Sequence, residues 1–252
     1  MDQTWIRAAR RLPHAPVRLV CFPHAGGSAS FYLPLAGLFG DGVEVLGVQY
    51  PGRLDRHREP AITDLGLLAD RVADALTDTV EGPFAFFGHS MGAILAFEVT
   101  RRLERRGALG PEVLFASGRR APSVNREENV HSCDDAGVIA ELRRLGGTDA
   151  SLLTDPDLIS MIMPALRADY TAIESYRCDP PQAAVGSPIE VLIGDADPRV
   201  AVEDAKSWAL HTSATCAIRV FSGGHFYLAE QASEVAGHVA ARLGLLSPLG
   251  RP

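Results

Sequence analysis

Residues 84–97 read FAFFGHSMGAILAF and decide how the rest of the chain is arranged. The first four, Phe84 to Phe87, form an apolar run short enough to be a strand buried on both faces. The run stops at GHSMG, and a helical pattern begins at Ala93. A serine between two glycines, where a strand meets a helix, predicts a sharp turn that exposes the Ser90 hydroxyl.

The two glycines of this turn, Gly88 and Gly92, provide room, because side chains there would collide across the reversed chain. The following helix directs free N–H groups and the positive end of its dipole toward Ser90. Such a turn suits a serine nucleophile whose reaction develops a negative oxygen. The alternative is a glycine-rich turn with an inert serine, and other parts of the chain must decide between the two.

Composition limits the classes of function. The chain has 252 residues, 46% hydrophobic and 22% charged, which is typical of one ordinary globular domain. A net charge of −7 without long runs of either sign argues against nucleic-acid or anionic-membrane binding. The apolar piece 17–22 is too short for a signal-peptide core, and no stretch approaches a membrane span, so we expect a cytoplasmic protein. The four cysteines are scattered without metal-ligand spacing, so we expect reduced thiols and no metal.

Strand and helix patterns alternate on both sides of the serine turn. This alternation predicts one α/β domain over residues 1–252, with a mainly parallel sheet covered by helices on both faces and Trp5-Ile6 at an edge. The expected strands are 17–22, 43–48, 84–87, 113–117, 189–193 and 217–221. The expected helices are about 30–39, one beginning at Leu65 after the cap Thr63-Asp64, one from the serine turn to about 106, 201–210, and a last helix to about 243.

The alternation breaks between about 121 and 187. This segment shows two helical patterns, at 135–145 and 156–176, and no strand. It lies between two strands of the sheet, so we expect it to leave from the carboxyl ends and cover Ser90 as a lid. The alternative is helical padding on an outer face.

A serine nucleophile needs a base and an orienting carboxylate, on loops after later strands in the order serine, acid, histidine. His225 follows the strand 217–221 on a glycine-flanked loop and is the expected base. Asp195 and Asp197 share the loop after 189–193. We prefer Asp197 as the acid, because it lies deeper in the loop, and expect Asp195 to be solvated or to cap the loop.

Acyl transfer also needs two donors for the developing oxyanion. The backbone N–H of Met91 follows the nucleophile and is one candidate. The second should come from the glycine-rich loop after the first strand, where we choose the N–H of Ala25. His24 in that loop could act as an acid or base, but we prefer the interpretation in which it braces the loop. We expect His89 to pack beside the serine turn.

Six motifs together resemble the type II thioesterases, which are freestanding editing hydrolases of polyketide and nonribosomal peptide synthesis with the α/β-hydrolase fold. The resemblance runs from about residue 5 to 243, and no catalytic position departs from it. In that family the acid lies three residues after the glycine of the late loop, which here is Asp197, and the oxyanion donors match Ala25 and Met91. The motifs are FPHAGG at 22–27, YPGR at 50–53, GHSMG at 88–92, LRADY at 166–170, GDADP at 194–198 and GGHF at 223–226.

The resemblance implies hydrolysis of acyl groups from the phosphopantetheine thiol of acyl or peptidyl carrier proteins, with removal of stalled or wrongly primed chains in antibiotic biosynthesis. It implies a Ser90, His225 and Asp197 triad, an acyl-enzyme, and no cofactor beyond the phosphopantetheine of the substrate. The alternatives are a general carboxylesterase or acyl-CoA hydrolase, and a non-catalytic scaffold that binds a carrier or ligand. Because nothing in the pattern demands a dimer, we expect a monomer.

Further side chains have two interpretations each. Arg53 either pairs with the pantetheine phosphate or an acidic carrier surface, or braces its own loop. Met161, Met163 and Leu166 either line an acyl pocket or are plain core at helical spacing. The arginines of the helix after Ser90 are expected to be a solvated face; they are Arg101, Arg102, Arg105 and Arg106.

Overall fold

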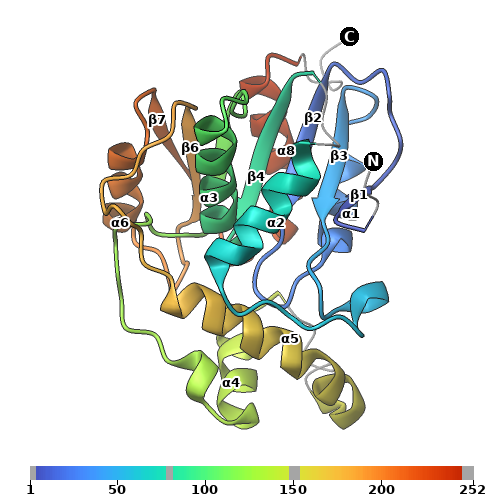
Figure 1. The fold of residues 1–252 in the computed structure, drawn as a ribbon, viewed down its shortest axis with the longest axis vertical. Coiled ribbons are helices and arrows are strands. Elements are labelled where there is room, and N and C mark those ends of the chain that lie inside the picture. The colour runs from blue at the N-terminus through green and yellow to red at the C-terminus, as the bar shows by residue number, and fades with distance from the viewer. Residues whose placement is uncertain (1–3, 78–81, 148–153, 246–252) are drawn as a thin grey trace.

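Seven strands form one sheet in the part of the chain that the computed structural model describes, residues 4–77, 82–147 and 154–245. The strand order is β1-β3-β2-β4-β5-β6-β7, and only β1 is antiparallel to its neighbour (Figure 1). The mainly parallel sheet predicted from the alternating pattern is confirmed, and Ile6 lies on the edge strand. The strands are β1 (Ile6–Ala8), β2 (Val17–Phe22), β3 (Val43–Val48), β4 (Phe84–His89), β5 (Leu114–Ser117), β6 (Ile189–Gly194) and β7 (Cys216–Phe221).

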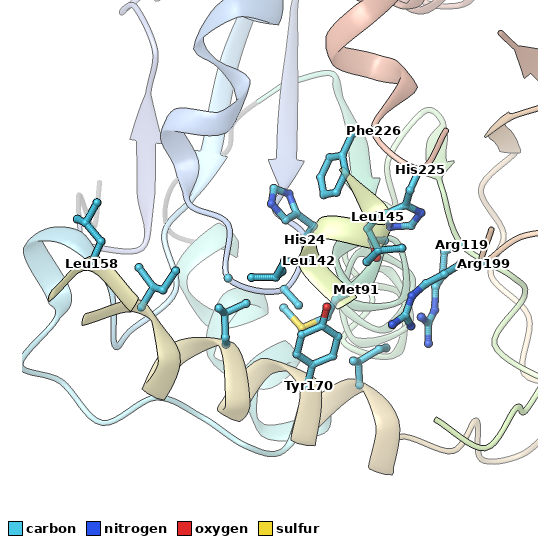
Figure 2. A pocket seen from close by; sticks show the side chains of 16 residues that line it. His24, Met91, Arg119, Leu142, Leu145, Leu158, Tyr170, Arg199, His225 and Phe226 are labelled. Atoms are coloured by element: carbon cyan, nitrogen blue, oxygen red, sulfur yellow. The ribbon is translucent and has the colours of Figure 1, made fainter. Parts of the chain in front are cut away.

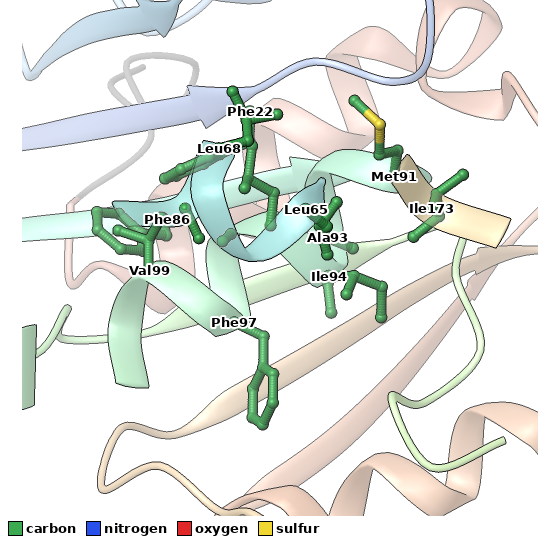
Figure 3. Close-up of a cluster of buried hydrophobic side chains, with 14 of the residues drawn as sticks. Phe22, Leu65, Leu68, Phe86, Met91, Ala93, Ile94, Phe97, Val99 and Ile173 are labelled. Carbon is green, nitrogen blue, oxygen red and sulfur yellow. The ribbon is translucent and has the colours of Figure 1, made fainter. Parts of the chain in front are cut away.

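Helices cover both faces of the sheet, as Figure 1 shows. Helices α2 (Leu65–Thr77) and α3 (Met91–Arg105) pack on one face, and α1 (Leu33–Ala36) and α8 (Ala232–Arg242) pack on the other. Alternate residues of a strand enter the two cores because successive side chains point to opposite faces. Phe22 lies with Phe86 and Leu68 in the core between the sheet and helices α2 and α3 (Figure 3). Its neighbour Cys21 lies in the core on the opposite face, beneath α1 and α8.

Three expected helices are broken in the structure. The expected helix 30–39 is a 3₁₀ turn, η1 (Ala29–Tyr32), followed by the single turn α1, where Pro34 stands at the start of a new helix. The expected helix 201–210 is α6 (Val202–Lys206) followed by the 3₁₀ segment η5 (Ser207–His211). The last helix divides into α7 (Tyr227–Glu230) and α8, because Gln231 between them departs from helical dihedral angles.

The prediction that the arginines of α3 form a solvated face holds for only two of the four. Arg105 and Arg106 are exposed, but the side chains of Arg101 and Arg102 are only 13% and 11% exposed. Both donate to the buried Glu98 at 2.6 Å. The solvated-face prediction was therefore wrong for these two residues, because a carboxylate one helical turn away and the neighbouring α2 enclose them.

Two helices lie beyond the carboxyl ends of the strands, α4 (Asp135–Leu145) and α5 (Pro156–Ser175), preceded by the short η3 (Val130–Ser132) (Figure 1). Asp134 caps α4 by accepting from the N–H of Gly137, and Asp155 caps α5. Both helices were predicted from their apolar spacing. Of the helices in the described residues, none is long and apolar enough to cross a membrane.

Candidate active site

The serine turn joins β4 to α3 through a strained residue. Ser90 has φ 55° and ψ −117°, a backbone conformation that residues other than glycine rarely adopt. Its N–H donates to Ser117 O at 2.8 Å. A Cβ on Gly88 would lie 2.2 Å from Gly92 O, which matches the collision predicted across the turn. A Cβ on Gly92 would instead lie 2.0 Å from Phe22 O, on the neighbouring strand β2. The second glycine is therefore required by the sheet rather than by the turn.

Ser90 is partly exposed at the start of α3, where unpaired N–H groups and the positive end of the helix dipole stabilise negative charge. Met91, the first residue of α3, is buried against the same cavity as Ser90. The geometry at this point favours a developing anion close to the serine oxygen.

The loops after β6 and β7 bring an acid and a histidine together. His225 Nδ1 lies 2.8 Å from Asp197 Oδ2, and both side chains are buried, at 1% and 0% exposure. The other oxygen of Asp197 accepts from the N–H of Arg199 at 2.8 Å, which holds the carboxylate in place. His225 lines the same cavity as Ser90, so the histidine that contacts the acid and the serine share one cavity.

Asp195, the other candidate acid, does not reach His225. Its Oδ1 accepts from the N–H of Gly223 at 2.9 Å and links the β6 loop to the β7 loop. The residue is otherwise exposed, in agreement with the loop-capping role expected for it.

The glycine-rich loop after β2 is held from the far side of the cavity. Asp169 of α5 accepts from the N–H of Gly26 at 2.7 Å through Oδ2. Ala25, the neighbouring residue, lines the cavity together with Gly26. The loop that supplies the candidate second oxyanion donor is therefore attached to a helix of the 121–187 segment.

The contacts of Arg53 fit the second of its two interpretations, in which it braces its own loop. It stands just before the 3₁₀ turn η2 (Leu54–Arg56), is 7% exposed, and contacts both oxygens of Asp169 at 2.6 and 2.9 Å. Its remaining donors reach the carbonyl oxygens of Pro51 and Gly27. Because Nε, Nη1 and Nη2 all donate to Asp169 or to these loops, the contacts favour the bracing interpretation over pairing with a pantetheine phosphate.

His24 is packed as an uncharged ring. It meets Phe31 and Phe226 edge-on, with ring centroids 4.6 and 4.8 Å away. Burial, with smaller effects of His225 and Arg53, lowers the pKa of His24 to about 3, so the ring is neutral near neutral pH and is not a cationic general acid. This packing favours the bracing interpretation over an acid–base role.

His89 lies beside the turn, as expected. It is fully buried, and its Nδ1 lies 2.9 Å from Ser117 Oγ, which in turn contacts the hydroxyl of Tyr227. Burial lowers its pKa well below the usual range, so His89 too is neutral.

A cavity of about 290 Å³ joins these elements. Figure 2 shows side chains entering it from the early loop, from α3, from the His225 loop and from both helices of the 121–187 segment. Most of the wall is apolar. The apolar side chains of α4 and α5 in it are Leu142, Leu145, Leu158, Ile162, Leu166 and Ile173.

Of the three α5 residues expected to line an acyl pocket, only Leu166 does so. Met161 is 62% exposed and points away, and Met163 is 6% exposed within the core. Neither methionine is among the wall residues, so the pocket interpretation is wrong for both, and Met163 fits the alternative of plain core.

Among the wall residues that sequence reasoning missed are two arginines, Arg119 and Arg199. Each follows a strand by a few residues, and Arg199 comes two positions after Asp197, a spacing that placed it near the acid. Their charge argued against a buried position, because arginines after strands are more often exposed to solvent. Among the described residues, no three histidine, cysteine, aspartate or glutamate side chains gather in a way that could hold a metal ion.

The fold is that of an α/β-hydrolase. A family model described as the thioesterase domain matches residues 17–243. The chain belongs to the thioesterase family, and within it to the type II thioesterases.

Two relatives carry the resemblance across almost the whole chain. The probable cadicidin biosynthesis thioesterase of Streptomyces griseus is 50% identical over 239 residues, which cover 95% of this chain but only 66% of that protein, just under two thirds of its length. Thioesterase PikA5 of Streptomyces venezuelae is 45% identical over 240 residues, covering 95% of this chain and 85% of its own.

A solved structure shows the same fold throughout. The type II thioesterase BorB from the borrelidin biosynthetic cluster superposes with a TM-score of 0.89 at 43% identity, covering 96% of this chain and 99% of that one. The RedJ thioesterase of the prodiginine pathway in Streptomyces coelicolor superposes with a TM-score of 0.86 at 36% identity, covering 92% of this chain and 87% of its own.

Proposed function

We propose that this chain hydrolyses acyl groups from the phosphopantetheine thiol of acyl or peptidyl carrier proteins, with Ser90, His225 and Asp197 as its catalytic triad. The observation that carries the proposal is the buried His225–Asp197 pair on the cavity into which the strained Ser90 opens. A single apolar cavity that holds both the nucleophile and its base suits an acyl chain.

The residues supply each step. Asp197 accepts a hydrogen bond from Nδ1–H of His225, which leaves Nε2 free to take the proton of Ser90 as its oxygen attacks the thioester carbonyl. The N–H groups of Met91 and Ala25 stabilise the oxyanion. The tetrahedral intermediate collapses by breaking the carbon–sulfur bond, and the pantetheine thiol leaves with the proton from His225.

Release of the acyl group repeats these steps with water. His225 takes a proton from water, whose oxygen attacks the acyl-enzyme carbonyl, and returns it to Ser90 as the acid departs. A thiol has a pKa of about 8.5, so its thiolate leaves with little assistance. Thioesters are therefore easier substrates than amides, and every step uses groups of this chain alone.

The proposed partner is a carrier protein of a polyketide or nonribosomal peptide synthase. Support comes from the relatives, whose names place them in cadicidin and borrelidin biosynthesis. We propose the same setting here, with removal of stalled or wrongly primed acyl chains as the role. We further propose that the 121–187 segment acts as a lid, since α4 and α5 supply much of the cavity wall.

The first prediction tests substrate and nucleophile together. Purified protein should release propionate faster from propionyl carrier protein than from propionyl-CoA or a propionyl oxygen ester, measured as kcat/KM by mass spectrometry. Ser90→Ala should lower each rate by about 10⁴-fold or more, because the nucleophile is lost while the fold is kept.

Two controls make the result interpretable. Thermal unfolding of Ser90→Ala should match the wild type, and a propionyl adduct on Ser90 should form only in the wild type. Equal kcat/KM for the carrier and the oxygen ester would favour a general carboxylesterase, and preference for CoA would favour an acyl-CoA hydrolase. Activity retained in Ser90→Ala would rule out the mechanism.

A further inference from the structure

The acyl cavity has a cationic end. Figure 2 shows Arg119 and Arg199 together on the side of His225, with Leu158 at the opposite end. The two arginines are only 7% and 8% exposed. Buried cations in an apolar wall are costly unless something pairs with them, so their partners decide what this end is for.

Arg199 is fully engaged by its neighbours. Its guanidinium contacts Glu128 at 3.0 Å and also Glu141. Its backbone N–H holds Asp197. Arg199 therefore secures the acid and closes this end of the cavity.

Arg119 is the under-paired member. Its guanidinium donates no hydrogen bond to any residue in the described parts of the chain, and its nearest carboxylate oxygen, Glu128 Oε2, is 3.8 Å away. Nε of Arg119 and Oε2 of Glu128 are both buried without a hydrogen-bond partner. Burial, followed by the charge of Arg120, lowers the pKa of Arg119 to about 9. A buried donor in this state gains free energy from an acceptor.

Tyr170 of α5 adds a second donor. Its ring is 5% exposed, and Figure 2 shows its hydroxyl pointing into the cavity. Burial raises the pKa of Tyr170 to about 12, so the hydroxyl stays protonated at neutral pH. Among the residues that the structure describes, its hydroxyl has no side-chain or backbone hydrogen-bond partner.

The position of Arg119 sets how far from the thioester such an acceptor would lie. Arg119 follows Gly118, where an added Cβ would come within 3.5 Å of His225 Cε1. The arginine thus begins next to the proposed base rather than at the far end of the cavity. Figure 2 also shows the Arg119 side chain on the His225 side of the cavity, so an acceptor atom bound here belongs to the part of the acyl chain closer to the reacting carbonyl than to the Leu158 end.

The charges of this cluster favour a neutral acceptor. The buried cations Arg119, Arg120 and Arg199 already face three carboxylates, from Glu128, Glu141 and Glu174. Arg144, which also contacts Glu141, is half exposed and screened by solvent. Arg119 therefore lacks an acceptor within hydrogen-bond distance, whereas the cluster as a whole does not lack negative charge.

We propose that Arg119 and Tyr170 form a subsite for an oxygen acceptor on the acyl chain, a keto or hydroxyl group on the carbon β to the thioester carbonyl. The inference rests on the proposed function, because it assigns a preference to the same cavity. Such a subsite makes the protein selective for β-oxygenated acyl groups over saturated acyl groups of equal length.

The test compares three synthetic thioesters of N-acetylcysteamine: butyryl, 3-hydroxybutyryl and malonyl. The full-length protein should show a higher kcat/KM for 3-hydroxybutyryl than for butyryl. Arg119→Met should lower that ratio by about tenfold, the loss expected for a hydrogen bond from a charged donor. Tyr170→Phe, which removes one oxygen atom, should lower the same ratio by a smaller factor.

Arg120→Met is the matched control. Arg120 is buried to a similar degree and contacts Glu128 at 2.9 Å, but it does not line the cavity. Its substitution should leave the ratio unchanged even where it lowers stability. If Arg119→Met does not fold, Tyr170→Phe alone decides the question.

The possible outcomes separate the two proposals. A wild type inactive on every thioester, butyryl included, contradicts the proposed function. An active wild type whose ratio is the same in Arg119→Met, Tyr170→Phe and Arg120→Met overturns only the subsite. A loss confined to malonyl overturns the assignment to a neutral oxygen.

Discussion

At the scale of single residues, Asp195 and Asp197 share one loop but have different partners. Asp197 contacts His225, whereas Asp195 accepts from the N–H of Gly223. The chain turns at Asp195 and Ala196, so the two side chains leave the loop in different directions and the two carboxylates have separate tasks.

The second prediction follows from that difference. Asp197→Asn should lower kcat for thioester hydrolysis by about 10⁴-fold, because an amide cannot select the required tautomer of His225 or stabilise its charged form. Asp195→Asn should change kcat by less than about threefold, since an amide oxygen still accepts from Gly223. Steady-state kinetics on one thioester measures both, and the reverse order would reassign the acid.

The third prediction concerns the turn glycines. Gly92→Ala should lower the free energy of unfolding by about 3 kcal/mol or more, because the new Cβ would overlap Phe22 O of β2. Gly237→Ala is the matched control. No atom lies within 4 Å of a Cβ there, so alanine should stabilise α8 by about 0.5–1 kcal/mol. Urea unfolding monitored by circular dichroism measures both, and equal effects would contradict the packing argument.

At the scale of elements, one carboxylate joins helix α5 to the early loop. Asp169 contacts Arg53 and the N–H of Gly26, and it is 1% exposed. The segment proposed as a lid and the loop proposed to supply an oxyanion donor are therefore parts of one hydrogen-bonded unit. Asp169 is a positioning residue for Ala25.

The fourth prediction tests that coupling. Asp169→Ala should lower kcat by about tenfold or more while changing KM little, because the loop that carries Ala25 loses its anchor and a misplaced donor weakens transition-state binding. It should also destabilise the fold by about 3–5 kcal/mol, since Arg53 is left buried and unpaired.

Glu98→Ala provides the comparison. Glu98 is a buried carboxylate that also pairs with arginine, but it lies on the outer side of α3, away from the cavity. The Glu98→Ala substitution should lower the free energy of unfolding, but it should leave kcat unchanged at temperatures where the protein is folded. A similar loss of kcat in both variants would reduce Asp169 to a purely structural role.

At the scale of the whole molecule, buried neutral histidines link stability to pH. His89 is fully buried, and its pKa is well below the value of about 6.5 expected in the unfolded chain. Below pH 6.5 the unfolded chain therefore binds more protons than the folded one. The stabilising effect is present above that pH and is lost as the pH falls.

The fifth prediction quantifies this effect. The free energy of unfolding should fall as the pH is lowered from 7 to 5, and His89 should contribute up to about 1.4 kcal/mol per pH unit below 6.5. His89→Gln removes that contribution, so its urea midpoint should depend less steeply on pH than the wild-type midpoint. Parallel pH profiles would show that His89 does not remain neutral in the fold.

The sequence by itself determined most strands and the longer helices, and the order of the chemical groups along the chain. The apolar runs and their spacing predicted β4, α3 and the helices α4 and α5, because burial of alternate or every third to fourth side chain leaves a local pattern. The motif around Ser90 and the loops with Asp197 and His225 were readable for the same reason: each lies directly after a strand.

Only the tertiary structure decided which distant side chains meet. Arg53 and Asp169 are 116 residues apart, and no local pattern shows that their charges cancel inside the fold. The same holds for Arg119, whose burial in the cavity wall depends on Tyr170 and Glu128 arriving from other segments. Periodicity records which face of an element is buried, but the partner of a buried charge is set by packing between elements, and there the sequence pattern carries no information.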